Sequence, residues 1–514
     1  MVQPDRERYC AACLPPGSTS THAISVAKRF APSAAMDRRA GAWTNAESPM
    51  FGRAWRVTAA TLLDAVIVGN LGAVVAVTFL GGFDIGIWSA SSAAKPVLIL
   101  LLVAPMRLAL PLGTAAGRLV AAWSRASASA WARLDQATRD VVPIASAVTL
   151  MLCVVGFLAN ALVEPLRPTS LPGQLRWQRF LEPFAVWDGA WYFDIATRGY
   201  HYASDSQSSV AFFPLYPLLV QAAAWPWGSS AEATLLAGFA ISSIAFLAAL
   251  IVLHRLAVHM TGSTETARRA ALYLAVFPFS FYFTRFYTEA VFLLLTVSAV
   301  WLATQSRWLL AGVAGALAAA TRPNGIVIAV PLVIMACTGR PAAAVLIRRI
   351  TQLAIVAAGP LAYSGYVYWL TGDPLAWLRA QQHWGYTLWH LPSRHLVTIA
   401  TDLDQVGLYQ YLLQGGDAPY ELLYATVAIA ALMLVPRVVS VCGLALGAYV
   451  AVSVVIPLSG NVLVGMGRYV SVLFPLFIAL GTLRSRRFHE VMLVVSSLLL
   501  AVLFGLFVSW HPLY

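Results

Sequence analysis

The chain alternates between long apolar runs and shorter polar connections. A helix that crosses a bilayer needs roughly 20 mainly apolar residues, and several runs approach that length. Shorter runs are expected to be half-spanning or buried, since irregular backbone at membrane depth must be packed in protein or line a wet cavity. The runs lie near 58–80, 95–115, 142–163, 210–226, 232–254, 270–284, 289–304, 308–321, 324–338, 350–370, 420–436, 438–458, 467–483 and 488–508.

This pattern predicts an all-α polytopic membrane protein with roughly 11–14 transmembrane helices. We divide it into a disordered cytoplasmic tail at 1–57, extra N-terminal transmembrane helices at 58–141, and a main module at 142–514. The tail has no apolar signal-peptide core, and translation starting at Met36 or Met50 is an alternative. Two long polar loops, 164–209 and 371–418, interrupt the main module.

Composition agrees with a bilayer rather than water as the main solvent. Apolar residues make up 59% of the 514 residues and charged residues 11%. Soluble domains carry about 25% charged residues. So few charges do not cover a water-soluble body of this size, and no long polar stretch is present to build a separate soluble domain.

The formal charge of +12 comes almost entirely from Arg. Arginines gather in the tail, in 118–133, and in the short connections at 255–269, 340–349 and 484–487, which the positive-inside rule makes cytoplasmic. Both long loops then lie outside. With 164–209 outside and 255–269 inside, only one of the runs 210–226 and 232–254 crosses the membrane completely. Pro214 and Pro217 mark 210–226 as the partial or re-entrant element.

Several site classes are disfavoured. The arginines form no stripe, which argues against nucleic-acid binding. Cys10 and Cys13 form a lone CxxC with no second pair or His cluster, so no metal site is expected. No P-loop or GxGxxG context occurs, which disfavours a nucleotide-sugar donor, and no cofactor is expected.

The first outer loop holds the strongest candidate for chemistry. Phe184, Trp187, Trp191 and Ile195 recur at helical spacing, which predicts an amphipathic helix in the membrane interface. Asp188 stands three and four residues before Trp191 and Tyr192, so a carboxylate is held among aromatic rings at headgroup depth. The alternative is an interfacial helix that only anchors the chain.

A second carboxylate does not join Asp188 on that helix. Asp194 follows six residues later, about 240° round the helix, so a paired acid and base is not expected there.

Four further charged residues, in three segments, interrupt apolar runs, where charges default to a functional hypothesis. Arg285 and Glu289 stand at i,i+4 spacing, Arg322 lies in TRPNG, and Arg468 lies in MGRYVSVLFP. Each has a plainer alternative. The first two could form a helix-end salt bridge, and Arg322 and Arg468 could snorkel to the interface.

Together these segments resemble the PIG-V-type mannosyltransferase family, which belongs to the GT-C superfamily of polytopic glycosyltransferases, and the chain looks like a bacterial member of it. The matching stretches occur in the family's order and cover most of 142–508. They are WDGAWYFDIATRGY (187–200), AFFPLYP (211–217), FPFSFYFTRFYTEAVFLLL (277–295), LLAGVAGALAAATRPNG (309–325), GDPLAWLRAQQHWG (372–385) and GRYVSVLFPLFIALG (467–481).

The resemblance implies an inverting transfer of a sugar, plausibly mannose, from a polyprenyl-phosphate donor on the outer face of the plasma membrane. Asp188 would be the general base, and Arg322 and Arg468 would hold the phosphate. The resemblance also points to substrate contacts from Trp187, Trp191, Tyr192, Tyr287, Glu289, His383 and Trp384. The acceptor would be a cell-envelope lipid, glycan or protein.

The chain differs from the family pattern in two ways, and two alternative functions remain. The resemblance does not cover the helices near 58–80 and 95–115, and an acidic residue expected shortly before AFFP is replaced by SDSQSSV, which offers only Asp205. A polytopic transporter or lipid flippase is the main alternative, although no internal repeat is present. A catalytically inactive scaffold is the other.

Overall fold

The computed structural model describes residues 51–80, scattered residues between 83 and 122, and then 128–164, 166, 185–386, 391, 393–413, 418–460 and 463–513. Cys10, Cys13 and most of the predicted run 95–115 lie outside these residues. The chain forms two compact units, 1–130 and 131–514.

The first unit contains one long helix, α2 (Phe51–Leu80). It covers the predicted run 58–80 and begins inside the predicted tail. A hairpin follows, in which β1 (Phe83–Asp84) pairs with β2 (Ser89–Ala90). Arg107 donates through Nε to Asp64 at 2.5 Å, with the arginine side chain 8% exposed. A charge this well buried at an apolar helix is stabilised by such pairing.

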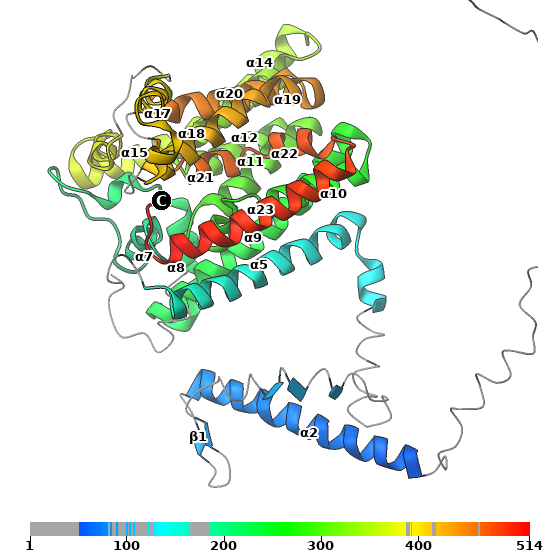
Figure 1. The fold of residues 1–514 in the computed structure, drawn as a ribbon. Helices are drawn as coiled ribbons and strands as arrows, with labels where there is room; N and C mark the ends of the chain where they lie inside the picture. Colours follow the sequence, from blue (N-terminus) through cyan, green and yellow to red (C-terminus); the bar gives the residue numbers. More distant parts are fainter. Residues whose placement is uncertain are drawn as a thin grey trace, which may run out of the picture. The chain divides into compact units, whose positions relative to one another are not determined.

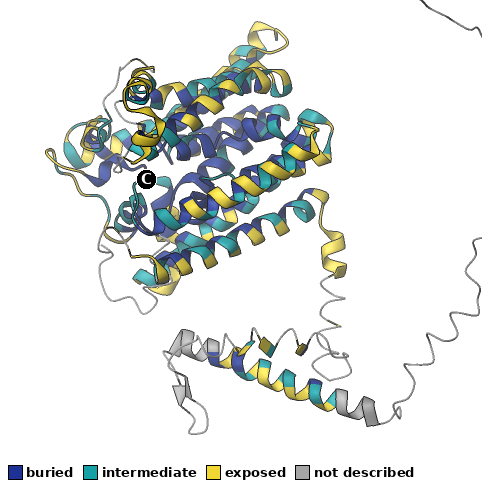
Figure 2. Ribbon diagram, in the orientation of Figure 1, coloured by how far each residue is buried: buried dark blue, intermediate teal, exposed yellow. Residues whose placement is uncertain are grey.

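The second unit is a bundle of helices with its buried residues in the interior (Figures 1 and 2). Its elements are α5 (Gln136–Leu162), α7 (Asp188–Arg198), η2 (Ser209–Ala211), α8 (Leu215–Ala224), η3 (Trp225–Trp227), α9 (Ala231–Thr261), α10 (Thr264–Ala275), η4 (Ser280–Thr284), α11 (Glu289–Thr304), α12 (Trp308–Ala319), η5 (Pro323–Ile328), α13 (Ala329–Cys337), α14 (Ala343–Leu353), η6 (Ala354–Ala357), α15 (Ala358–Thr371), α16 (Ala376–Ala380), η7 (Gln381–Trp384), α17 (Arg394–Leu413), α18 (Ala418–Met433), α19 (Val435–Cys442), α20 (Leu444–Leu458), α21 (Met466–Ser471), α22 (Phe474–Gly481) and α23 (Arg486–Val508).

The bundle is that of an all-α polytopic membrane protein, as predicted. Among the described residues, five segments are long and apolar enough to cross a membrane: 136–160, 231–261, 343–371, 418–442 and 486–508. Five shorter apolar helices of 10–17 residues accompany them. The count of 11–14 crossings stays a prediction, because helices this short do not cross a bilayer alone when straight.

The relative direction of α5 and α9 is fixed by two polar contacts. Arg255, near the end of α9, pairs with Asp135 at the start of α5 at 2.8 Å. One residue earlier, His254 contacts Asp140 at 3.0 Å. The two helices therefore run antiparallel, and α9 begins at the end of the bundle where α5 finishes. This agrees with a partial element at 210–226, since α8 has only 10 residues.

The prediction of one continuous run at 270–284 is wrong. Helix α10 ends at Ala275, and the chain turns through η4 before α11 begins at Glu289. Pro278 lacks an N–H and interrupts the helix. Irregular backbone in a core needs polar partners, and here Ser242 donates to the Arg285 carbonyl at 2.7 Å.

Two other expectations need correction. The second long loop, 371–418, contains α17, two helical pieces joined by a kink at Gly407, and its apolar residues recur among polar ones. The run 438–458 is divided between α19 and α20 at Gly443, whose φ of +85° favours glycine.

Small residues bring α12 close to its neighbours. A Cβ on Gly312 would lie 2.4 Å from the Gln352 carbonyl oxygen, and one on Gly359 would lie 2.2 Å from the Ala316 carbonyl oxygen. Such close backbone approach is typical of helix packing in membranes, where small residues line the interfaces. It holds η5, which follows α12, against the rest of the bundle.

Candidate active site

The site begins where α7 starts. Trp187 precedes the helix with φ +57°, a conformation that bulky residues rarely adopt. Its indole N–H donates to the Phe507 carbonyl at 3.2 Å, and its ring lies 5.1 Å from that of Trp510. These contacts fix the start of α7 to the end of α23. Asp188 is thereby placed in the first turn of α7, where the carboxylate faces a cavity.

Two carboxylates and two guanidiniums form one network beside this turn. Arg468 donates through NH1 to Oδ2 of Asp188 and through Nε to Oε1 of Glu289, the latter at 2.7 Å. Arg322 donates through NH1 to the same Oε1 of Glu289 at 3.0 Å. The four formal charges cancel, which lowers the cost of burying them.

The members of the network differ in burial. The side chain of Glu289 is 0% exposed, that of Arg322 6%, that of Arg468 10% and that of Asp188 20%. Glu289 lies beneath the arginines and outside the cavity lining, whereas Asp188 and both arginines line the cavity. Of the two carboxylates in the network, Asp188 is thus the one that a ligand in the cavity can reach.

Aromatic rings surround the two guanidiniums. Arg468 stands 4.9 Å from the ring centre of Tyr287 and 5.3 Å from that of Tyr282. Arg322 stands 5.1 Å from the ring centre of Tyr469. Rings placed in this way attract a cation through their π-faces. The Tyr287 hydroxyl also donates to the Val186 carbonyl at 3.0 Å, so it braces the start of α7.

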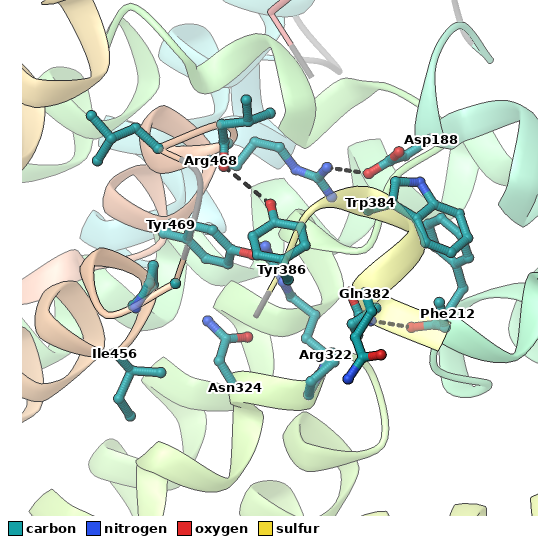
Figure 3. Close-up of a pocket in the computed structure, with 18 of the residues that line it drawn as sticks. Asp188, Phe212, Arg322, Asn324, Gln382, Trp384, Tyr386, Ile456, Arg468 and Tyr469 are labelled. Carbon is teal, nitrogen blue, oxygen red and sulfur yellow. Dashed lines mark hydrogen bonds and ion pairs between the residues drawn. The ribbon is translucent and has the colours of Figure 1, made fainter. Parts of the chain in front are cut away.

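The cavity has a volume of about 860 Å³ and combines charged, aromatic and apolar surface (Figure 3). Figure 3 shows Arg468 reaching toward Asp188, with Arg322 and Asn324 at the lower side and Ile456 across the view from Trp384. Its polar lining includes Asp188, Tyr192, Arg322, Asn324, Arg379, Gln381, Gln382, Tyr386, Tyr420, Glu421, Arg468 and Tyr469. Its apolar lining includes Ile326, Val327, Leu378, Ile456, Pro457, Leu463 and Val464.

The segment from α16 to Tyr386 connects two walls of the cavity. Gln381 donates to the Ala211 carbonyl at 2.8 Å, and the Trp384 ring lies 5.4 Å from that of Phe212. Beyond η7, the Tyr386 hydroxyl donates to the Val464 carbonyl at 3.1 Å. Burial raises the pKa of Tyr386 well above its ordinary value of 10, so this hydroxyl keeps its proton and remains a donor.

Half of the predicted site residues line the cavity and half support it. Asp188, Tyr192, Arg322, Trp384 and Arg468 are in the lining. The others are Trp187, Trp191, Tyr287, Glu289 and His383.

The supporting residues act in different places. Trp191 stacks between His201 and Phe212, with ring centres 5.8 and 5.6 Å away. His383 is exposed and contacts the Ser204 carbonyl at 3.1 Å. Trp187, Trp191, Tyr287, Glu289 and His383 do not belong to the described cavity lining, and the substrate contacts expected of them stay predictions.

The other acidic candidates lie away from the network. Asp194 pairs with Arg198 at 3.0 Å and contacts His201, in keeping with its predicted place on another face of α7. Asp205 is exposed and does not belong to the cavity lining. Within the described residues, no group of three or more His, Cys, Asp or Glu is arranged to hold a metal ion.

Sequence reasoning missed several lining residues. Asn324 follows Arg322 in the TRPNG motif, and its buried Oδ1 has no hydrogen-bond partner among the described residues. Tyr420 and Glu421 stand in the first turn of α18, and Tyr469 follows Arg468. The motif could have indicated Asn324. Nothing local marks Tyr420 or Glu421, because only the packing of α18 brings them to the cavity.

Comparison with solved structures finds the oligosaccharyltransferase AglB of Archaeoglobus fulgidus. The apo form is 12% identical with a TM-score of 0.39, covering 72% of this chain and 56% of that one. The complex with an inhibitory peptide and a dolichol-phosphate has the same identity and coverage, with a TM-score of 0.36. This chain thus spans little more than half the length of those proteins, and a likeness this weak carries no argument. A search of curated proteins finds no match.

The family comparison is more direct. Residues 148–389 match the family model described as Mannosyltransferase (PIG-V). The matched range begins within α5 and ends shortly after η7, and it includes Asp188, Glu289 and Arg322 of the charged network. Arg468 joins them from outside the matched range. Over residues 148–389, this membrane protein is therefore similar to the PIG-V mannosyltransferases.

Proposed function

We propose that this protein is an inverting glycosyltransferase that moves a sugar, with mannose as the first candidate, from a polyprenyl-phosphate donor to a cell-envelope acceptor. The observation that carries the proposal is that Asp188 lines the same cavity as Arg322 and Arg468, and is bonded to Arg468. A base for the acceptor hydroxyl and a cationic site for a phosphate therefore share one space.

The donor phosphate is assigned to Arg322 and Arg468. A guanidinium presents donors in a planar fork that matches phosphate oxygens. Both arginines line the cavity, and Glu289 holds both from beneath. The apolar residues of the lining, which include Ile326, Ile456 and Val464, suit the first isoprenoid units of a lipid chain. This division of the cavity supports a lipid-linked donor over a water-soluble one.

Asp188 is assigned as the general base. The acceptor hydroxyl gives its proton to the Asp188 carboxylate while its oxygen attacks the anomeric carbon. The bond between that carbon and the phosphate oxygen breaks, and the polyprenyl phosphate leaves with the bonding electrons. Attack opposite the leaving group inverts the configuration. Positioned proton transfer of this kind contributes about 10²–10⁴ in rate.

Extracytoplasmic placement of this site is also part of the proposal. The cavity is formed near the start of α7, the start of α18 and the end of α23. The arginine-bearing connections at 255–269 and 484–487 belong to the ends of helices that begin or finish away from it. The positive-inside rule assigns those connections to the cytoplasm, and a plasma membrane is the expected location.

The experiment is sugar transfer by purified protein in detergent, with polyprenyl-phosphate-[¹⁴C]mannose and a native lipid extract. Asp188→Asn should abolish labelled product, whereas Asp194→Asn on the same helix should retain it. Equal transfer by the wild type and Asp188→Asn would refute the base. Absence of transfer by the wild type with mannose, followed by transfer with another polyprenyl-phosphate sugar, would correct the sugar and keep the reaction.

A further inference from the structure

The proposed base is engaged by the proposed phosphate ligand. Arg468 uses Nε for Glu289 and NH1 for Asp188. A phosphate gains most from two parallel donors on one edge of a guanidinium. Since Nε points to the buried Glu289, the edge that remains for a ligand in the cavity is the one that carries Asp188.

The two carboxylates on Arg468 are unequal. Glu289 is fully buried and also bonds Arg322, so it is fixed from two sides. Asp188 is 20% exposed, lines the cavity and stands in the first turn of a helix. An incoming anion therefore displaces Asp188 far more readily than Glu289.

Charge balance gives the displacement a consequence. Asp188, Glu289, Arg322 and Arg468 sum to zero formal charge. A sugar phosphodiester brings one negative charge and takes the cation away from Asp188. A carboxylate that loses its cationic partner and gains a like-charged neighbour binds a proton more strongly. Transfer of the acceptor proton to Asp188 removes the charge of that carboxylate while the leaving polyprenyl phosphate gains one, so the total charge of the assembly does not change.

Resting on the proposed function, we infer that the donor phosphate and the Asp188 carboxylate compete for Arg468, so that the base is released only when the donor is bound. Glu289 is the positioning residue that keeps Arg468 in place during the exchange. The acceptor hydroxyl is consequently activated only after the donor binds. An acceptor that enters the cavity before the donor meets a base that is still bonded to Arg468.

The test measures binding of undecaprenyl phosphate to the full chain in detergent by quenching of tryptophan fluorescence. The sugar-free lipid is used so that binding is read without turnover. Competition predicts that Asp188→Asn binds this lipid about tenfold more tightly than the wild type, because one charge-assisted contact no longer has to be broken. If Asp188 did not compete with the phosphate, Asp188→Asn would bind undecaprenyl phosphate with the affinity of the wild type.

Two controls separate competition from general charge repulsion. Asp194→Asn removes the same charge from the same helix and should change the affinity by less than about twofold, as for an exposed ion pair. In an Arg468→Lys background, Asp188→Asn should lose most of its tightening, because a single ammonium does not present the fork shared by both carboxylates. If that variant does not fold, the two aspartate variants alone decide.

The outcomes are distinct. Tightening by Asp188→Asn alone supports the inference. Unchanged or weaker binding, or equal tightening by Asp194→Asn, overturns the competition while leaving the transferase reaction intact. Failure of every variant, the wild type included, to bind undecaprenyl phosphate overturns the donor class proposed above and this inference with it.

Discussion

Arg322 and Arg468 donate to the same oxygen of Glu289, although they belong to different elements of the bundle. The distances are 3.0 and 2.7 Å. Arg322 precedes η5 and Arg468 lies in α21, so one carboxylate sets the spacing of two cations that reach the cavity from different helices. This arrangement makes Glu289 a structural requirement of the site without placing it in contact with substrate.

Replacing Glu289 with Gln should therefore destabilise the protein as well as inactivate it. Arg468 would keep its contact with Asp188, whereas Arg322 would lose the carboxylate that it contacts. Breaking a buried pair from one side costs about 3–5 kcal/mol. The measurement is the midpoint of thermal unfolding in detergent, together with sugar transfer. Glu490→Gln is the matched control, because Glu490 pairs with an exposed Arg486. Its cost should not exceed about 1 kcal/mol. Equal midpoints for the two variants would contradict the role of Glu289.

Gly467 provides a second test of how the arginine is held. A Cβ at this position would lie 2.3 Å from the Phe279 ring, so Gly467→Ala should overpack the core and cost about 1–3 kcal/mol. Because Arg468 is the next residue, transfer should fall as well. Gly505→Ala should be tolerated, since its nearest neighbour would be the Ala159 Cβ at 3.9 Å. A Gly467→Ala protein with wild-type midpoint and activity would show that α21 shifts without cost.

The sequence predicted the class of fold because long apolar runs leave few alternatives. It also predicted an amphipathic helix around Asp188, from the three- and four-residue recurrence of Phe184, Trp187, Trp191 and Ile195, and the structure has α7 at Asp188–Arg198. It did not predict the interruption between α10 and α11. A run of apolar residues looks the same whether it forms a helix or, as around Pro278, irregular buried backbone satisfied by a distant Ser242.

The charged network was predicted in its members and not in its geometry. Arg322 and Arg468 were singled out as charges among apolar residues, and Glu289 as a neighbour of Arg285. The structure pairs Glu289 with partners 33 and 179 residues away along the chain. Separations of that size come from packing alone, so local spacing favoured the nearby Arg285.

Trp384 should affect substrate binding more than stability. It lines the cavity, and its ring packs 5.5 Å from that of Trp191. Trp384→Ala should raise KM for a substrate about tenfold, within the range for losing one packed aromatic contact, and change the unfolding midpoint little. Trp369→Ala is the control, because Trp369 is 78% exposed on α15. A fall in kcat at unchanged KM would instead assign Trp384 to positioning of the catalytic groups.

Membrane orientation is open to a chemical test, since the proposed active site and the arginine-rich connections must face opposite sides. In a cysteine-free background, Asp205→Cys and Arg255→Cys each introduce one thiol at an exposed position. A membrane-impermeant maleimide added to intact cells should label position 205. Position 255 should be labelled only after the membrane is opened. Arg255 pairs with Asp135 at the start of α5, at the end of the bundle that the positive-inside rule assigns to the cytoplasm. Labelling of 255 in intact cells, with 205 protected, would reverse the orientation. The acceptor would then have to be a cytoplasmic one, while the cavity chemistry would stand.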